Sequence, residues 1–147
     1  MIESYVHGDL DEYVDLFLDV FLNEPWHYHW MTREATARYF TDIENTPCFL
    51  GLVYRAEDGR GVTGVCLGVI SDYFTPKVYD IKEIAVRRSE QGKGRGTRML
   101  AEIEKFLSAR GVTAVTLLTH RTIRAYNFYL RNGYQVDEDS VYMSKDI

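Results

Sequence analysis

A glycine-rich segment is the part of the sequence best suited to binding chemistry. Residues 91–97 read Gln-Gly-Lys-Gly-Arg-Gly-Thr and lie between an apolar run that ends at Val86 and an amphipathic pattern that begins at Arg95. Glycine at alternate positions lets the backbone turn tightly and approach a ligand, because no Cβ intervenes. The first turn of a helix adds unpaired N–H groups and a partial positive charge. Residues 87–98 carry five basic residues against one acid, so the segment predicts a phosphate-binding site.

Two common phosphate-binding motifs do not fit this segment. A P-loop ends in Gly-Lys followed by Ser or Thr, whereas Gly94 is followed by Arg95 and Gly96 by Thr97. A dinucleotide fingerprint reads Gly-x-Gly-x-x-Gly after an early strand, with an acidic residue about 20 residues later. The segment here reads Gly-x-Gly-x-Gly, and the strand that follows it ends at His120 without an acid.

The sequence resembles the GCN5-related N-acetyltransferase (GNAT) family at two places. The family motif Gln/Arg-x-x-Gly-x-Gly/Ala, which lies between a strand and a helix, is similar to Gln91-x-x-Gly94-x-Gly96. The family's Ala-x-x-Phe-Tyr-x-x-x-Gly-Phe/Tyr helix is similar to residues 125–134, Ala-Tyr-Asn-Phe-Tyr-Leu-Arg-Asn-Gly-Tyr. The resemblance covers nearly the whole chain and implies an N-acetyltransferase that uses acetyl-CoA as its donor.

The resemblance also implies which residues hold acetyl-CoA. In the family, the main chain at the end of the strand pairs with the pantetheine arm, and the loop amides hold the pyrophosphate. Thr122 stands where many members have an Asn that contacts the cofactor, and its hydroxyl can still form a hydrogen bond. The implied cofactor-binding residues are Ala85, Val86, Gln91, Gly92, Lys93, Gly94, Arg95, Gly96, Thr97 and Thr122.

Transfer of an acetyl group to an amine requires a base and an acid. An ammonium must lose a proton before it attacks the thioester, and a proton donor stabilises the thiolate that leaves. In the family, the Tyr of the Phe-Tyr pair commonly protonates this thiolate, which assigns the role to Tyr129. Glu83 is expected to face the same side of its strand as Ala85, so Glu83 is the candidate base, with a water relay as the alternative. The N–H of Val86 is expected to polarise the thioester carbonyl.

The acceptor side is expected to be aromatic and to take a cation. Residues 26–30 read Trp-His-Tyr-His-Trp, and in the family the segment between the first two helices often forms one wall of the acceptor site. Residues 1–86 carry 15 acidic against 6 basic residues, which favours an amino sugar, a polyamine, a small amine or a lysine side chain as acceptor. The expected substrate-binding residues are Trp26, Tyr28, Trp30, Asp72, Tyr79 and Glu83, with Tyr73 as a further helper.

Hydrophobic periodicity predicts a mixed α/β chain that begins with a short strand. Amphipathic patterns predict helices over 9–24, 32–44, 95–110 and 122–132. Asp9 and Glu12 form a capping pair at the start of the first helix. Apolar runs predict strands over 48–54, 62–70, 78–86 and 112–119, followed by a final hairpin of 134–136 and 141–143. The strand over 112–119 is nearly all apolar, so it is expected to be covered on both faces.

The length of 147 residues predicts a single domain over residues 1–147. The resemblance implies a GNAT-type α+β fold for this domain. Its central sheet would be mixed, mostly antiparallel and six- to seven-stranded, with about four flanking helices. We expect a monomer or a homodimer.

Composition argues against several other functions. The longest stretch without a charge has 11 residues, well short of the roughly 20 that a membrane-spanning helix needs. The first residues do not resemble a signal peptide, so a cytoplasmic location is expected. A net charge of −5 opposes nucleic-acid binding. The histidines and cysteines lack metal-ligand spacing, so no metal is expected.

A second function of a different class is compatible with the same residues. A non-catalytic acyl-CoA-binding or sensing domain would keep the glycine-rich loop and acetylate nothing. Such a domain would bind the cofactor tightly and release no thiol with any amine.

Overall fold

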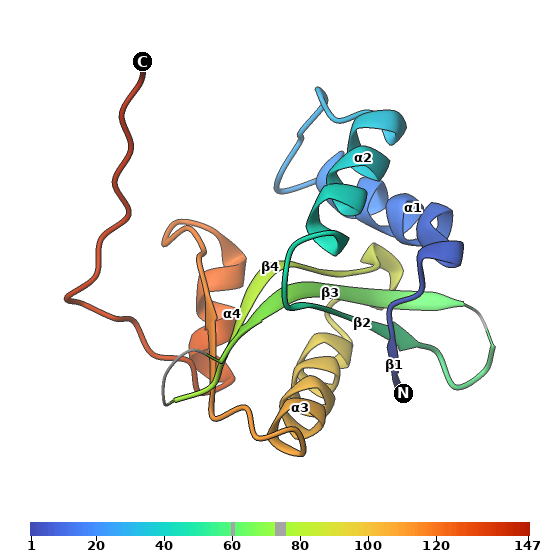
Figure 1. The fold of residues 1–147 in the computed structure, drawn as a ribbon. Coiled ribbons are helices and arrows are strands. Elements are labelled where there is room, and N and C mark those ends of the chain that lie inside the picture. The colour runs from blue at the N-terminus through green and yellow to red at the C-terminus, as the bar shows by residue number, and fades with distance from the viewer. Residues whose placement is uncertain (60, 73–75) are drawn as a thin grey trace.

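The structure, a computed structural model, describes residues 1–59, 61–72 and 76–147 (Figure 1). Its helices are α1 (Leu10–Phe21), α2 (Arg33–Glu44), α3 (Arg95–Ser108) and α4 (Arg124–Arg131), with short 3-10 turns η1 (His7–Asp9) and η2 (Arg88–Glu90). Its strands are β1 (Ile2–Ser4), β2 (Phe49–Arg55), β3 (Val62–Ser71), β4 (Val78–Val86) and β5 (Ala114–Leu117). They form one sheet in the order β1-β2-β3-β4-β5, antiparallel up to β4 and parallel between β4 and β5. The predicted α+β class is confirmed, with five strands in the described residues instead of six to seven.

The sheet is covered on both faces by amphipathic helices. Figure 1 shows α1 and α2 on one face and α3 on the other. Phe17 and Phe40 pack on the first face, where their rings meet edge to face with centroids 5.1 Å apart. Met99 and Ile103 of α3 pack on the second face beside the buried Tyr79. Because both cores contact β3 and β4, these two strands are held at the centre of the fold.

The expected capping pair at the start of α1 does not form. The Asp9 side chain makes no capping hydrogen bond and accepts one from Arg55 Nη2 at 2.7 Å. Glu12 Oε1 accepts a hydrogen bond from Val62 N at 2.6 Å. The bond from Arg55 to Asp9 is charge-assisted and therefore stronger than a bond to a neutral amide. Together the two carboxylates hold the start of α1 to β2 and β3. Thr32 caps α2, because Thr32 Oγ1 accepts a hydrogen bond from Ala35 N at 3.1 Å.

The C-terminal part of the sheet is smaller than expected. β5 has four residues and is only partly buried, which corrects the prediction of a strand over 112–119 that is covered on both faces. The expected hairpin of 134–136 and 141–143 is absent, and the chain after α4 runs away from the sheet (Figure 1). Val141, Tyr142 and Met143 are exposed. Two three-residue strands form a hairpin that is marginal without further packing, and the far edge of β5 is left without a partner strand.

Among the described residues, no helix is both long and apolar enough to cross a lipid bilayer. The same part of the chain contains no group of three or more His, Cys, Asp or Glu side chains arranged to hold a metal ion.

Candidate active site

The glycine-rich loop connects β4 to α3 and contains two residues in a left-handed conformation. Gly92 and Gly94 have φ angles of 72° and 73°, a region that favours glycine because a Cβ would crowd the backbone. Gly96 serves a different purpose, since a Cβ there would lie 3.3 Å from the Phe128 ring. The glycine spacing therefore shapes the loop and lets the start of α3 approach α4 closely.

The start of α3 presents main-chain donors that the helix itself does not use. Arg98 N donates to Gly94 O at 3.1 Å in the first turn, so the preceding amides of Arg95, Gly96 and Thr97 have no carbonyl of the helix to bond. Gly94 stands at the N-cap without a side chain, and the first turn contains no acidic residue. An anion placed here accepts these N–H groups and is stabilised by the dipole of α3.

Acidic side chains partly neutralise the basic residues around the loop. Glu90 has only 8% of its surface exposed, and it pairs with Arg95 Nε at 3.3 Å and with Lys93 Nζ at 3.9 Å. Arg98 forms an ion pair with Glu57 in the turn after β2. The positive charge at the loop is thus smaller than the count of basic residues suggests, and the main-chain N–H groups gain importance for anion binding.

The end of β4 has main-chain groups that point away from the sheet. Arg87 N donates to Thr63 O at 2.8 Å, which continues the antiparallel ladder with β3. Because hydrogen-bonding directions alternate along a strand, the main chain of Ala85 faces β3, and that of Val86 faces the other side. Gln91 Nε2 donates to Val86 O at 2.8 Å from that open side. Val86 N therefore points to the side where a ligand can add to β4 as an extra strand.

A bulge in β4 marks the point where β4 and β5 separate. Leu67 of β3 pairs with Glu83, whereas the next residue, Gly68, pairs with Ile81, so Lys82 is the extra residue on β4. The ladder between β4 and β5 runs from Val78 and ends at Ile81, just before this bulge. A bulge bends its strand and turns side chains to new directions. Here it coincides with the opening between the two strands.

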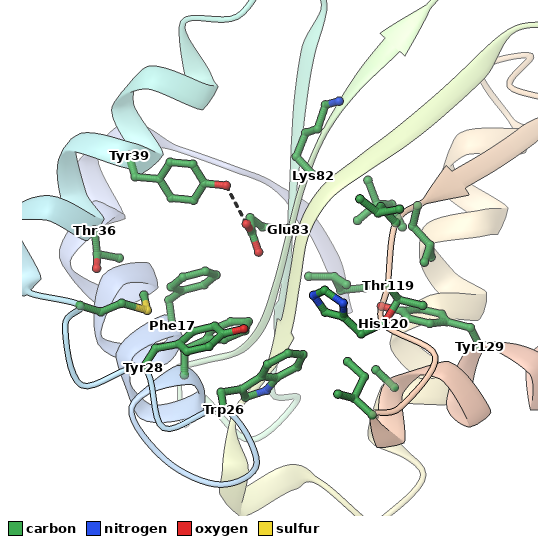
Figure 2. A pocket seen from close by; sticks show the side chains of 18 of the residues that line it. Phe17, Trp26, Tyr28, Thr36, Tyr39, Lys82, Glu83, Thr119, His120 and Tyr129 are labelled. Atoms are coloured by element: carbon green, nitrogen blue, oxygen red, sulfur yellow. Dashed lines mark hydrogen bonds between the residues drawn. The ribbon is translucent and has the colours of Figure 1, made fainter. Parts of the chain in front are cut away.

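A cavity of about 490 Å³ lies at this opening (Figure 2). Its walls come from α1, the loop between α1 and α2, α2, β4, the chain after β5, and α4. The side chains that line it include Phe17, Phe21, Trp26, Tyr28, Trp30, Met31, Tyr39, Lys82, Glu83, Leu118, His120 and Tyr129. The volume falls within the range of about 300–1,000 Å³ that is usual for small-molecule sites.

Glu83 is the acidic side chain of this cavity. The Tyr39 hydroxyl donates to Glu83 Oε1 at 2.6 Å, and Figure 2 shows this pair facing the cavity from α2 and β4. Burial raises the pKa of Glu83, and the hydrogen bond from Tyr39 opposes this effect by stabilising the carboxylate. Glu83 and Ala85 do lie on the same face of β4, as the α2 contact of Glu83 and the packing of Ala85 in the α1 core show.

Tyr129 contributes a phenol from α4, on the opposite side of the cavity. Its residue is 9% exposed, and its ring packs against Phe128 and Tyr134 with centroids 5.3 and 5.5 Å away. Burial raises the pKa of Tyr129 to about 12, with a further contribution from the negative charge of Glu83. The hydroxyl thus keeps its proton at neutral pH and can donate it. Figure 2 shows Tyr129 and Glu83 across the cavity from one another.

Stacked rings form the wall of the cavity below α2. The Tyr28 ring lies nearly parallel to that of Phe21, at 7° and 6.1 Å, and stacks on Trp30 at 5.2 Å. Trp26 packs against Phe21 at 5.1 Å. Trp30 is 75% exposed and forms the rim of the cavity, whereas Trp26 and Tyr28 are half-buried. The three aromatic residues expected at the acceptor site therefore lie together.

Comparison with known families identifies the fold. The sequence matches the model of the Acetyltransferase (GNAT) family over residues 11–134. The chain belongs to this family. The expectation drawn from the two GNAT motifs is thereby confirmed, and GNAT membership supports acetyl transfer as the general activity.

Solved structures share the GNAT fold over the whole chain. A transcriptional regulator from Bacillus halodurans has a TM-score of 0.75 at 17% identity, with 99% of each chain covered. Aminoglycoside antibiotic 6′-N-acetyltransferase AAC(6′)-Ih from Acinetobacter baumannii has a TM-score of 0.72 at 15% identity, covering 100% of this chain and 98% of the other. A possible acetyltransferase from Clostridium difficile has a TM-score of 0.77 at 14% identity, covering 100% and 97%. The search of curated proteins gives no match.

Several residues expected at the site of this GNAT chain do not line the cavity. Asp72 follows β3 and pairs with Lys77 at 3.3 Å. Tyr79 is fully buried on the α3 face, where its hydroxyl donates to a main-chain carbonyl of β2 at 2.8 Å. Thr122 is exposed in the turn before α4. Tyr73 lies outside the described residues. We therefore leave Asp72 and Tyr79 out of the acceptor site proposed below, and the contact of Thr122 with the cofactor stays a prediction.

Three cavity residues were not expected from the sequence. Tyr39 of α2, Lys82 of β4 and His120 after β5 line the cavity, and none of them is among the site residues expected above. The bulge explains Lys82, because an extra residue in β4 cannot be seen in a pattern of alternating apolar residues. A Tyr on a helix and a Glu on a strand far along the chain carry no local signal of their contact. His120 follows the end of β5. Polar site residues are common at strand ends that lie beside an opening in the sheet.

Proposed function

We propose that this GNAT chain is an acetyl-CoA-dependent N-acetyltransferase that transfers the acetyl group directly to a primary amine in a ternary complex. The observation that carries this proposal is the pair of Glu83 and Tyr129, which line one cavity between β4 and β5. One of these groups can accept a proton and the other can donate one. The cavity opens beside the end of β4, from which the glycine-rich loop departs.

The geometry of the loop and of β4 supports acetyl-CoA as the donor. The free amides at the start of α3, with those of residues 91–94, fit the pyrophosphate. The main chain of Val86 faces the open side of β4 and can pair with the amides of the pantetheine arm. These two sites follow one another along the chain, so a bound pantetheine arm would point its thioester toward Glu83. Lys93 and Arg95 would stay close to the phosphates.

The mechanism divides the proton transfers between the two sides of the cavity. Glu83, or a water that it holds, takes a proton from the acceptor ammonium, and the free amine attacks the thioester carbonyl carbon. Val86 N donates a hydrogen bond to the carbonyl oxygen as negative charge develops there. Tyr129 gives its proton to the sulfur when the carbon–sulfur bond breaks, and the proton that the attacking nitrogen must still lose passes through water to the Tyr129 phenolate. The products are an amide and the free thiol of CoA.

The raised pKa of Glu83 suits it to the role of base. A base works best when its pKa lies near the operating pH, because it is then ionised and still binds a proton well. Burial moves the pKa of Glu83 in this direction from the ordinary range of a carboxyl group. Tyr39 holds the same carboxylate at 2.6 Å and so directs it into the cavity.

Two measurements in sequence test the proposed function. Calorimetric titration with acetyl-CoA is expected to show binding at micromolar affinity, and thiol release with a panel of primary amines is then expected to show turnover. Binding without thiol release for any amine would favour the alternative, a non-catalytic acyl-CoA-binding or sensing domain. Absence of binding at millimolar acetyl-CoA would remove both functions.

Other properties of the chain stay predictions at this point. These are its cytoplasmic location, its single domain, its state as a monomer or a homodimer, and its lack of nucleic-acid and metal partners. Size-exclusion chromatography with light scattering measures the oligomeric state directly.

A further inference from the structure

The acceptor half of the cavity contains much aromatic surface and little acidic charge. Phe17, Phe21, Trp26, Tyr28 and Tyr39 line it together. The rings of the first four form one connected set, since Phe17 and Phe21 lie 4.3 Å apart and Phe21 contacts both Trp26 and Tyr28. An extended aromatic wall of this kind favours an apolar or aromatic body in the ligand.

Glu83 is the one acidic residue among the described side chains that line the cavity. Lys82 and His120 also line the cavity, and each carries an ionisable nitrogen group. The Lys82 ammonium pairs with Asp80 Oδ2 at 2.5 Å, so Asp80 is already occupied by a cation. The cavity thus offers one carboxylate to one ammonium group.

Several acidic residues of the first half of the chain form ion pairs away from the cavity. Three carboxylates, those of Glu3, Asp9 and Glu12, surround the single guanidinium of Arg55. Asp15 pairs with Arg33 outside the cavity. The sequence-based expectation of a cationic acceptor, with polyamines and amino sugars among the candidates, depended on the excess of acidic residues in this half. Since the carboxylates do not gather at the cavity, the argument for a polyamine or an amino sugar is lost.

We propose that the acceptor is a monoamine whose single ammonium lies at Glu83 and whose apolar, preferably aromatic, body packs on Trp26 and Tyr28. This inference rests on the proposed function. A second or third ammonium on the same molecule would lie against rings without a carboxylate. Cation–π contact with those rings offsets only part of the cost of burying an unpaired charge. The ammonium loses one proton to Glu83 or water, and the free amine attacks the acetyl carbon. The sulfur leaves with the Tyr129 proton, and the second proton of the nitrogen passes through water to the Tyr129 phenolate. The products are an N-acetyl monoamine and CoA, with one proton released to the solvent.

Wild-type protein and a small set of amines test the substrate class. Thiol release is measured with 2-phenylethylamine, ethylamine, spermidine, kanamycin and a lysine-containing peptide at one pH. We expect kcat/KM for 2-phenylethylamine to exceed that for each other amine by about tenfold or more, because contacts to an apolar pocket discriminate on this scale. Equal or higher kcat/KM for spermidine, kanamycin or the peptide would overturn the inference.

Binding of the amines separates this inference from the proposed function. Calorimetry of 2-phenylethylamine and spermidine, each with protein loaded with CoA in place of acetyl-CoA so that no turnover occurs, reports the preference of the cavity directly. If acetyl-CoA binds but no amine is acetylated, the proposed function fails, and the order of the two affinities still decides the substrate class. Tighter binding of spermidine would reject the monoamine.

Variants of the aromatic wall locate the preference in the cavity. Tyr28→Ala is expected to lower kcat/KM for 2-phenylethylamine about tenfold while that for ethylamine changes little, and Tyr28→Phe is expected to retain the preference because the ring remains. Tyr142→Ala, in the exposed C-terminal segment, is the control. An equal loss for both amines would show a structural role for Tyr28. Met31→Glu adds a carboxylate to the same wall and is expected to raise the relative kcat/KM for spermidine, and no such rise would contradict the charge argument.

Discussion

The Tyr39 hydroxyl donates a hydrogen bond of 2.6 Å to Glu83 Oε1, which joins α2 to the bulge of β4. Burial and the neighbouring carboxylate raise the pKa of Tyr39, so its hydroxyl keeps its proton at neutral pH and remains a donor. The same bond lowers the pKa of Glu83 while burial raises it. The position of α2 therefore controls both the direction of the carboxylate and its affinity for a proton.

Replacement of Glu83 by Gln tests whether the carboxylate is the base. Glu83→Gln keeps the shape and can still accept the bond from Tyr39, but it cannot take a proton from the amine. We expect kcat to fall by about 10²–10⁴-fold, the usual contribution of general acid–base catalysis, with an unchanged Kd for acetyl-CoA. A kcat within a few-fold of wild type would assign the proton transfer to water.

The same variant has an expected effect on stability that is independent of turnover. A carboxyl group whose pKa is raised by folding stabilises the native state only while it is protonated, and this contribution is lost as the pH rises through the folded pKa. Glu83→Gln carries no such loss. We expect its free energy of unfolding, relative to wild type, to increase as the pH rises from 4 to 7, as measured by urea denaturation. A constant difference would contradict the raised pKa.

Removal of the Tyr39 hydroxyl should move the pH dependence of turnover. Glu83 must be ionised to act as a base, so kcat falls as the pH drops through its pKa. Tyr39→Phe removes the bond that lowers this pKa, and we expect the acidic limb of the kcat–pH profile to shift to higher pH. Tyr54→Phe removes a similar bond, from Tyr54 to Glu102 at 3.5 Å on the α3 face, and is the matched control. If the acidic limb of Tyr39→Phe stays in place or moves to lower pH, the limb does not report the pKa of Glu83.

The acid on the other side of the cavity has its own test. Tyr129→Phe keeps the ring packed against Phe128 and Tyr134 but removes the proton donor. We expect kcat to decrease by at least about 10²-fold, while the Kd for acetyl-CoA and the melting temperature stay close to wild type. An acetyl donor with a less basic leaving group should restore part of the rate, because its departure needs less protonation. Equal turnover of wild type and variant would remove Tyr129 from the mechanism.

The strand, glycine-rich loop and helix of residues 78–108 could be predicted from the sequence because their signals are local. The bounds 78–86 expected for the third long strand are those of β4, and the glycine spacing at 92 and 94 corresponds to two left-handed residues. Hydrophobic periodicity, the glycine positions and the signals for a helix start all act within a few residues of one another. These signals do not depend on how distant parts of the chain pack.

The acceptor side could be predicted only in part because its contacts are long-range. Tyr39 and Glu83 are 44 residues apart, and Lys82 becomes an extra residue only through the pairing of β4 with β3. Tyr79 was expected at the acceptor site, but its side chain packs in the core beside α3. Charge totals also do not say which carboxylates lie at the cavity and which pair with Arg55. The prediction of a C-terminal hairpin was wrong. Two such short strands need a packing partner, and a local sequence pattern does not show whether one is present.

Substitution of Gly94 tests whether the loop conformation serves anion binding. Gly94 has a φ of 73° and a Cβ there would meet no atom within 4 Å, so Gly94→Ala acts through backbone strain alone. Gly111, just beyond the other end of α3, has a φ of 77° and is equally open, which makes Gly111→Ala the matched control. The left-handed conformation costs a non-glycine residue roughly 1–2 kcal/mol, so we expect a similar loss of stability in both variants. Relief of the strain in Gly94→Ala moves the amides at the start of α3, and we expect its Kd for acetyl-CoA to rise about tenfold, which corresponds to about 1.4 kcal/mol. Calorimetry should show no such rise for Gly111→Ala, and equal affinities in the two variants would place the phosphates away from this loop.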